Sequence, residues 1–381
     1  MTVAARPFGL DLPDYPWDTM APYRAVAARH PDGVVDLSIG TPVDPTPAVL
    51  QDALAGAADA PGYPTIHGTP ALREAVVAWY ERRRGVPGLD PDAVMPTVGS
   101  KELVAWLPLL LGLRPGDVLV RPTVAYPTYD IGARLAGAEA VAADDLDELA
   151  PDVRSRVRMV WINSPANPTG RVRDVAAARR IVDQARALGA VVASDECYAE
   201  LGWGPWDVQR GGSPVPSVLD PSVTGGDDSL LLSAYSLSKQ SNVAGYRAAF
   251  LAGDGRLMRG LVNSRKHAGM IVPAPVQKAM RAGLGDDEHV RAQKARYRAR
   301  RERLVPAVEA FGLRIDASEA GLYLWCTAGE DTWETVRRFA ERGVVVGPGA
   351  FYGAAGEGHV RLALTAADER IDAAVQRLTA A

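Results

Sequence analysis

The sequence predicts an α/β protein with two domains. Short apolar runs rich in valine and isoleucine alternate with helical stretches through the middle of the 381-residue chain, and this alternation is typical of parallel strands joined by crossover helices. From about Pro273 the pattern changes to long helices and a few short strands, which indicates a second, smaller domain. With 47% hydrophobic residues, the chain is long enough to bury the core of a large domain and that of an appendage.

Seven apolar runs are predicted strands of the large domain: residues 94–98, 118–121, 138–142, 158–162, 191–194, 230–234 and 248–251. We expect them to form a mainly parallel seven-stranded sheet between helices, built from residues 46–272. Residues 1–45 and 273–381 are expected to form a smaller α+β domain, with short strands near 321–326, 344–346 and 359–364 and a final helix from about Ala367. In open parallel sheets, ligands bind outside the carboxyl ends of the strands, so functional residues are sought there.

Composition excludes several classes of function. A net charge of −4 gives no general attraction to nucleic acid or to an anionic membrane. Neither the two cysteines nor the five histidines have metal-ligand or paired spacing, so we expect no metal site and no disulfide framework. The longest apolar run, 103–113, contains Pro108 and is too short to span a membrane, and no secretory signal is visible. We expect a cytoplasmic protein with a small-molecule ligand.

Two segments are suited to binding a phosphate next to an amine. Ser236-Leu237-Ser238-Lys239 is followed eight residues later by Arg247. A lysine amine can hold an aldehyde as a Schiff base, while serine hydroxyls and an arginine bind phosphate oxygens. Ser100 and Lys101 follow a strand and open an apolar helix, whose free N–H groups suit a phosphate, although Ser100 would also serve as an ordinary cap. This combination suggests pyridoxal phosphate.

Residues after other strands would suit the ring of that cofactor. Asp195 ends a buried strand, where its carboxylate would keep a pyridine nitrogen protonated, and Tyr198 would bond the phenolic oxygen. Asn167, in a rigid Asn-Pro-Thr-Gly loop, would donate to the same oxygen, and Tyr126 would stack on the ring. A helix cap, a plain turn and aromatic packing are the competing interpretations of Asp195, Asn167 and Tyr126.

Arg361 lies within the otherwise apolar strand pattern of residues 358–364. A buried guanidinium without an anionic partner is costly, so this side chain needs an anion. A substrate carboxylate matches its planar fork, and an internal Asp or Glu would satisfy it equally well. Residues 291–303 contain seven basic side chains, which we interpret as the solvated face of a helix because the chain as a whole is acidic.

Taken in order, these motifs resemble those of class I/II aminotransferases, which are fold-type I pyridoxal-phosphate enzymes, over essentially the whole chain. The resemblance implies that Lys239 holds the cofactor covalently and is a catalytic residue together with Asp195 and Tyr198. It also implies a homodimer with shared active sites, in which Tyr63 reaches the partner's phosphate, and places Gly40 near bound substrate. The remaining implied contacts are the phosphate with Ser100, Lys101, Ser236, Ser238 and Arg247, the ring with Tyr126, Asn167, Asp195 and Tyr198, and the substrate with Arg361, Asn167 and Gly40.

Four segments, 16–19, 36–45, 194–198 and 265–270, look like those of actinobacterial succinyldiaminopimelate aminotransferases. That likeness implies transfer of an amino group from glutamate to N-succinyl-2-amino-6-oxopimelate, a reaction of lysine and diaminopimelate biosynthesis. Arg265, Lys266 and Lys101 are then candidates for the distal carboxylate, against their interpretation as surface charges. The same site residues would also serve a class I/II aminotransferase of broad specificity or a carbon–sulfur β-lyase.

Overall fold

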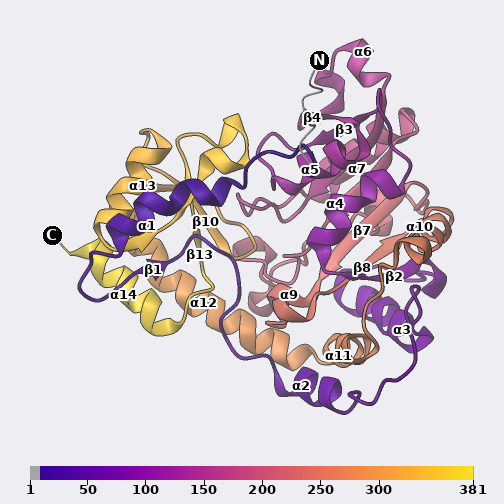
Figure 1. Ribbon diagram of the computed structural model, residues 1–381, viewed down its shortest axis with the longest axis horizontal. Coiled ribbons are helices and arrows are strands. Elements are labelled where there is room, and N and C mark those ends of the chain that lie inside the picture. Colours follow the sequence, from indigo (N-terminus) through magenta and orange to yellow (C-terminus); the bar gives the residue numbers. More distant parts are fainter. Residues whose placement is uncertain (1–8, 381) are drawn as a thin grey trace, which may run out of the picture.

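The computed structural model describes residues 9–380 and contains a large α/β domain and a smaller α+β domain (Figure 1). The large domain is built on a seven-stranded sheet with the order β2-β8-β7-β6-β5-β3-β4. All seven predicted strands are confirmed: β2 (Val94–Val98), β3 (Val118–Arg121), β4 (Glu139–Ala142), β5 (Val157–Asn163), β6 (Val191–Asp195), β7 (Leu231–Ser236) and β8 (Ala248–Gly253). Only β8 runs antiparallel to its neighbours, so the sheet is mainly parallel, as predicted.

Both faces of this sheet are buried, which explains why its strands are almost continuously apolar. In β3, Val118 and Val120 face one core and Leu119 faces the other, because successive side chains of a strand point to opposite faces. The first core is covered by α3 (Pro70–Trp79), α7 (Val175–Ala187) and α11 (Ala274–Gly285), and the second by α4 (Ser100–Leu110), α5 (Thr128–Ala136) and α10 (Gly255–Ala268). Shorter helices connect these elements: α2 (Ala48–Ala55), α6 (Pro151–Arg154), α8 (Pro221–Thr224) and α9 (Leu237–Gln240).

The smaller domain combines the two ends of the described chain, as Figure 1 shows by the indigo and yellow ribbons lying together. Its four-stranded antiparallel sheet has the order β12 (Gly347–Pro348), β13 (Val360–Ala363), β10 (Tyr323–Thr327) and β9 (Arg314–Ala317). A separate parallel pair joins β1 (Val35–Asp36) to β11 (Val344–Val345). Four helices pack around these strands: α1 (Ala21–Ala27), α12 (Asp287–Ala310), α13 (Thr332–Glu341) and α14 (Asp368–Thr379).

Strands β1, β9 and β12 are absent from the sequence prediction. Two of them have only two residues each, too few for any periodicity, and β9 carries Arg314 and Asp316 at the edge of its sheet. Pairing with a partner strand therefore decides these elements, because local pattern does not mark them.

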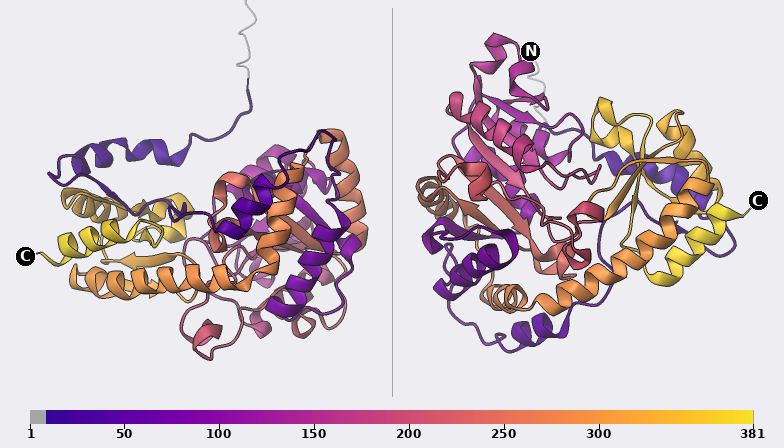
Figure 2. Two further views of the ribbon diagram at one scale, coloured as in Figure 1. Left: turned by 90° about the horizontal axis from the view of Figure 1, so that it is seen from below. Right: turned by 180° about the vertical axis from the view of Figure 1, so that it is seen from behind.

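The boundary at residue 273 stays a prediction, and the packing of α11 bears on it. Met280 and Leu284 of α11 belong to the core of the large domain, whereas Tyr297 and Leu304 of α12 belong to the core of the smaller one. Figure 2 shows α12 running from one domain into the other. We therefore propose that the division lies within α12.

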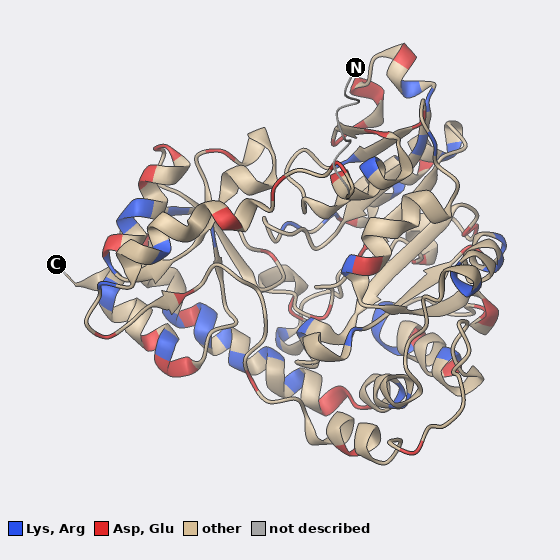
Figure 3. Cartoon of the chain, in the orientation of Figure 1, with Lys and Arg blue, Asp and Glu red and all other residues tan. Residues whose placement is uncertain are grey.

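The basic stretch 291–303 lies on α12, where Figure 3 shows basic residues separated by uncharged ones along much of the helix and acidic residues at its beginning. Arg298 pairs with Asp207 at 2.8 Å, and Arg300 pairs with Asp44 at 2.6 Å. Arg303 donates to Asp368 at 2.8 Å. These ion pairs join the stretch to carboxylates of the same chain, and Lys294 and Arg300 are buried, so the stretch is only in part the solvated face that the sequence predicted. Across residues 9–380, no helix is both long and apolar enough to cross a membrane.

Candidate active site

The candidate residues gather at one edge of the large sheet. Asp195 ends β6, Asn167 follows β5, and Ser236 ends β7. Strand β2 runs in the same direction as these strands, so Ser100, which follows β2, lies at the same edge. Because β8 runs in the opposite direction, the residue that precedes it, Arg247, also comes to this edge. The topology thus explains why one predicted residue precedes its strand and the others follow theirs.

Lys239 lies on the four-residue helix α9 and is half-buried. Its Nζ donates a hydrogen bond of 2.5 Å to the carbonyl oxygen of Gly40, a residue 199 positions earlier in the chain. A Cβ at Gly40 would lie 2.1 Å from Tyr323 Oη, so only glycine fits there. The structure therefore brings Gly40 and Lys239 together, and it adds Tyr323, which sequence reasoning missed.

Asp195 is buried between two donors. Its Oδ1 accepts from the backbone N–H of Cys197 at 3.2 Å, and its Oδ2 accepts from Tyr129 Oη at 3.2 Å. Burial raises the pKa of the Asp195 carboxyl, and these hydrogen bonds act against that rise. A nearby pyridinium would compensate the buried carboxylate, which is the chemistry expected of a pyridoxal site. Tyr129 belongs to the same Tyr-Pro-Thr-Tyr run as Tyr126, but nothing in the sequence distinguished its role.

Tyr126 is half-buried beside this carboxylate. Its ring meets the ring of Tyr129 edge-on, with 6.0 Å between centroids, and the Tyr129 ring stacks on Trp161. Burial raises the pKa of Tyr126 to about 12, so its hydroxyl is neutral at neutral pH. The packing of Tyr129 and Trp161 holds Tyr126 in place, in agreement with a stacking role.

A second group of polar residues surrounds Arg361, which is only 4% exposed. Its Nη1 donates to Asn167 Oδ1 at 2.9 Å and its Nη2 donates to the carbonyl oxygen of Ser38 at 2.6 Å. The guanidinium lies 4.0 Å from the centre of the Tyr323 ring. Its buried Nε has no hydrogen-bond partner, and within residues 9–380 no carboxylate lies within ion-pair distance of Arg361. Among the described residues, therefore, no Asp or Glu pairs with Arg361, although the sequence left that pairing open.

Tyr198 reaches the same group, with its Oη 3.0 Å from Tyr323 Oη. Burial raises the pKa of Tyr198 well above its ordinary value. Burial acts in the same direction on Tyr323, but the positive charges of Arg361 and Lys239 outweigh it and lower the pKa of Tyr323. Of the two paired phenols, Tyr323 is therefore the more acidic one.

The predicted phosphate ligands form a cradle of donors. Ser100 is the first residue of α4, an 11-residue helix whose N-terminal N–H groups are free to bind an anion. Gly99, with φ of 78°, precedes it, and a Cβ there would lie 2.2 Å from Arg247 Nη2. Ser236 Oγ and Ser238 Oγ lie 2.9 Å apart. Glycine at position 99 thus lets the guanidinium of Arg247 approach the beginning of the helix.

Arg247 donates to the carbonyl oxygen of Ala244 at 2.9 Å, and it has no carboxylate partner among residues 9–380. The side chain of Lys101 is exposed and places its Nζ 5.6 Å from the centre of the Tyr15 ring. Only the backbone of Lys101 is therefore available to the cradle. Hydroxyl, amide and unpaired guanidinium donors fit a phosphate, so the residues present suit pyridoxal phosphate.

Three predicted residues lie apart from this group. Tyr63 is fully exposed at 100%, and no other predicted site residue contacts it within the chain. Arg265 is fully buried, and it donates to both oxygens of Glu102 at 3.0 and 3.3 Å. This ion pair corrects the suggestion that Arg265 binds a distal substrate carboxylate, because its fork is already occupied. Lys266 is exposed at the end of α10.

Comparison with known proteins identifies the family. Residues 32–378 match the family model described as aminotransferase class I and II. The chain is a class I/II aminotransferase. Members of this family use pyridoxal 5′-phosphate, which agrees with the donor cradle and the buried Asp195.

Two relatives of this aminotransferase are each 54% identical to it. One is the 4-dedimethylamino-4-oxo-anhydrotetracycline transaminase of Streptomyces rimosus, with 97% of this chain and 99% of that protein covered. The other is a probable aminotransferase of Mycobacterium tuberculosis, with 97% and 85% covered. Among solved structures, a probable N-succinyldiaminopimelate aminotransferase from Thermus thermophilus matches with a TM-score of 0.84 and 30% identity, covering 95% of this chain and 99% of that one.

These matches bear on the expectation that the chain is a succinyldiaminopimelate aminotransferase. The aminotransferase activity and the cofactor agree with the sequence prediction. The relatives at 54% identity, however, are named for a tetracycline precursor or for no substrate, and the diaminopimelate enzyme is more distant. The likeness to succinyldiaminopimelate aminotransferases is thus not the strongest one, and the broader prediction of a class I/II aminotransferase has better support.

Proposed function

We propose that this aminotransferase holds pyridoxal phosphate on Lys239 and moves an amino group between glutamate and a 2-oxo acid whose carboxylate binds Arg361. The observation that supports it most is the environment of Arg361. This guanidinium is buried, faces Tyr323, and has neither a carboxylate partner among residues 9–380 nor a partner for its Nε. A buried cation in this state is costly unless a ligand brings the charge. A planar carboxylate matches the fork.

In this proposal, the cofactor supplies an electron sink that weakens the bonds at the substrate Cα. Lys239 Nζ would take the proton from the substrate Cα as general base and deliver it, as general acid, to the C4′ carbon of the cofactor. Asp195 lies buried at the end of β6, where it would hold a proton on the ring nitrogen. Asn167 and Tyr198 would donate to the ring oxygen, and Asn167 is held in place by Arg361.

We propose that the range of amino acceptors is broader than N-succinyl-2-amino-6-oxopimelate alone. Support comes from the 54% identity to a transaminase named for a tetracycline precursor and from the loss of Arg265 as a distal carboxylate ligand. The 30% likeness to the Thermus enzyme keeps the succinyl acceptor as the second candidate.

A panel of amino donors tests this proposal in single half-reactions. We expect glutamate to convert the aldehyde form of the cofactor to the amine form. We expect the rates with succinyldiaminopimelate, aspartate, alanine and kynurenine to lie within about 100-fold of one another, because all four donors bind through the same α-carboxylate. Absorbance of the holoenzyme follows the conversion. A preference for succinyldiaminopimelate above that range would support the narrow acceptor instead, and pyruvate release from cystathionine without an acceptor would indicate a β-lyase.

We also propose a homodimer in which Tyr63 of each subunit binds the phosphate in its partner. Tyr63 is fully exposed and borders a groove of about 820 Å³ between α2 and α11, lined in part by Ala57, Lys278 and Arg281. A tyrosine side chain that is fully exposed in its own chain is suited to a partner that covers it.

Tyr63→Phe is expected to weaken binding of pyridoxal phosphate about tenfold, because it removes one hydrogen bond to a charged group. Equilibrium titration of the cofactor measures this, and light scattering should give twice the chain mass of 40.5 kDa. Tyr23→Phe is the control, since Tyr23 stacks on Trp333 in the smaller domain. A monomer, or a Tyr63→Phe variant with the affinity of the parent protein, would contradict the shared site.

A further inference from the structure

One face of α12 carries three polar side chains that contact the segment directly after Lys239. His289, Gln293 and Tyr297 are spaced by four residues, so they lie on one face of the helix. We call these three residues the α12 stripe. Their side chains are at most 7% exposed. The residues they meet, Ser241 and Asn242, are equally buried, at 0% and 8%.

Each member of the α12 stripe makes its own contact. His289 Nε2 lies 2.8 Å from Ser241 Oγ, and Gln293 Oε1 accepts from Asn242 Nδ2 at 2.8 Å. Tyr297 Oη lies 3.2 Å from Asn242 Oδ1 and 3.4 Å from the carbonyl oxygen of Lys239 itself. Asn242 is therefore bound through both ends of its amide, and Tyr297 reaches the backbone of the lysine.

The N-terminal segment joins the same contacts. Asn242 Nδ2 also approaches the carbonyl oxygen of Pro45 at 3.3 Å, and Thr46 Oγ1 donates to the carbonyl oxygen of Asn242 at 2.9 Å. Gln293 Nε2 donates to Asp44 at 2.7 Å. Asn242 thus connects the segment after Lys239 both to α12 and to the N-terminal segment that carries Gly40. The carbonyl oxygen of Gly40 accepts the hydrogen bond from Lys239 Nζ.

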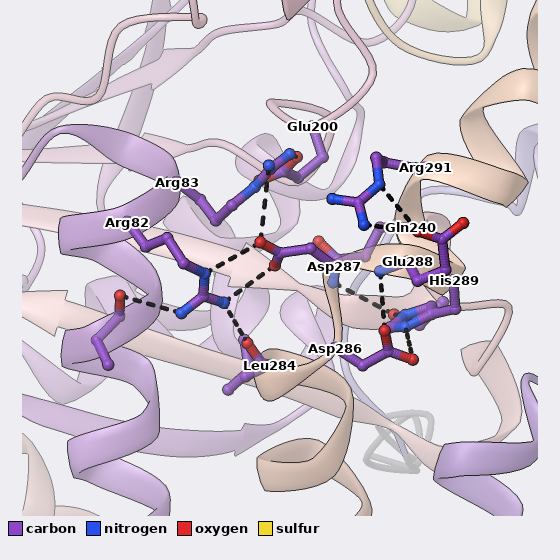
Figure 4. A network of polar contacts seen from close by, with 12 residues as sticks. Arg82, Arg83, Glu200, Gln240, Leu284, Asp286, Asp287, Glu288, His289 and Arg291 are labelled. Carbon is purple, nitrogen blue, oxygen red and sulfur yellow. Dashed lines mark hydrogen bonds and ion pairs between the residues drawn. The ribbon is translucent and has the colours of Figure 1, made fainter. Parts of the chain in front are cut away.

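Helix α12 is held at its beginning and again just past its middle, which makes it a firm support. Figure 4 shows its beginning, where Arg82 of the large domain donates to Asp287 at 3.0 Å and to the carbonyl oxygen of Leu284 at 2.7 Å, and where Asp286 and His289 lie together. Farther along the helix, Arg300 is held by Asp44 and Asp368 of the smaller domain.

We propose that Asn242 and Tyr297 are positioning residues for Lys239. The proposal rests on the role proposed above for that lysine. Helix α9 has four residues and is too short to hold its own shape, so outside contacts must set the backbone of Lys239. Asn242 adopts the left-handed conformation, with φ of 53°, and its side-chain contacts keep it there. Asn242 and Tyr297 thereby fix where Lys239 Nζ lies relative to the substrate Cα.

Tyr297→Phe and Asn242→Gly test this positioning role in the holoenzyme. The first removes only a hydroxyl, and the second removes the amide while keeping a residue that accepts a positive φ. Each is expected to lower kcat for the glutamate half-reaction about tenfold, since misplacement of a reacting group costs rate, while KM changes by less than about twofold because Arg361 is untouched. The pH midpoint of the visible absorbance of the substrate-free holoenzyme, which reports the proton on the lysine nitrogen, is expected to shift by about half a unit or more.

Tyr80→Phe is the matched control, because it removes another buried tyrosine hydroxyl, one that donates to Ser233 at 2.8 Å and does not contact the lysine segment. Its kcat and pH midpoint are expected to equal those of the parent protein, with any loss limited to thermal stability. If Tyr297→Phe and Asn242→Gly behave like Tyr80→Phe, the positioning role is wrong. If instead the absorbance of the parent protein does not depend on Lys239, the proposed function fails first, so the two failures are distinct.

Discussion

Replacement of Lys239 by alanine is expected to abolish both turnover and the visible absorbance that borohydride removes. The absorbance requires a covalent bond between an amine and the cofactor aldehyde. Lys239 Nζ is the amine that lies beside Gly40 at the edge of the large sheet, and its charge helps to lower the pKa of Tyr323. Loss of the general base as well as the covalent link should lower kcat by about 10⁴-fold or more. Spectra before and after borohydride treatment and steady-state rates with glutamate measure the two effects.

Two variants control for this experiment. Lys239→Arg keeps a positive charge but cannot take part in the bond or release its proton at neutral pH, so it is expected to be as inactive as Lys239→Ala. Lys266→Ala removes an exposed lysine at the end of α10 and is expected to keep the absorbance. An active, absorbing Lys239→Ala protein would overturn the assignment.

The second large effect is expected for Arg361→Met, a change that keeps much of the side-chain volume. It should lower kcat/KM for glutamate by about 100- to 1,000-fold, mainly through KM, because a buried charged hydrogen-bonding pair with the substrate carboxylate is lost. The visible absorbance should persist, since the phosphate cradle and Lys239 are separate from Arg361. An unchanged KM would remove the carboxylate role.

The stability of this variant distinguishes a ligand-binding arginine from a structural one. Arg361 is buried without a carboxylate partner among residues 9–380, so replacing it by an apolar side chain should leave the free energy of unfolding unchanged or raise it. Arg265→Met is the contrast, because it strips Glu102 of its buried partner and should cost about 3–5 kcal/mol. Chemical denaturation of both proteins without substrate measures this difference.

Much of the large domain could be predicted from local pattern. Strands β2 and β3 have the predicted bounds, and β6 and β7 differ by only one or two residues at their ends, because buried parallel strands are continuous apolar runs. Strands β9 and β12 escaped prediction, since two to four residues at the edge of a sheet carry too little pattern.

The candidate site divides in the same way. Motif chemistry was sufficient to propose Lys239, Asp195 and Arg361 as candidates, because each type of side chain suits one part of an amino-acid reaction with pyridoxal phosphate. It was insufficient for Tyr129 and Tyr323, whose roles depend on neighbours 66 and 125 residues away. Arg265 was misjudged for the same reason, because Glu102 lies 163 residues from it in the chain.

The sequence alone determined which residues are candidates for the reactive groups and where along the chain the strands before them lie, starting with the lysine of the Ser-Leu-Ser-Lys239 run. Only the tertiary structure decided which groups meet: Lys239 with Gly40, Arg361 with Asn167 and Ser38, and Asn242 with Tyr297. The physical reason is the distance along the chain over which each kind of information acts. Apolar periodicity and motif chemistry act over a few neighbouring residues, whereas these contacts join segments from different parts of the chain, so the packing of the whole fold sets their distances.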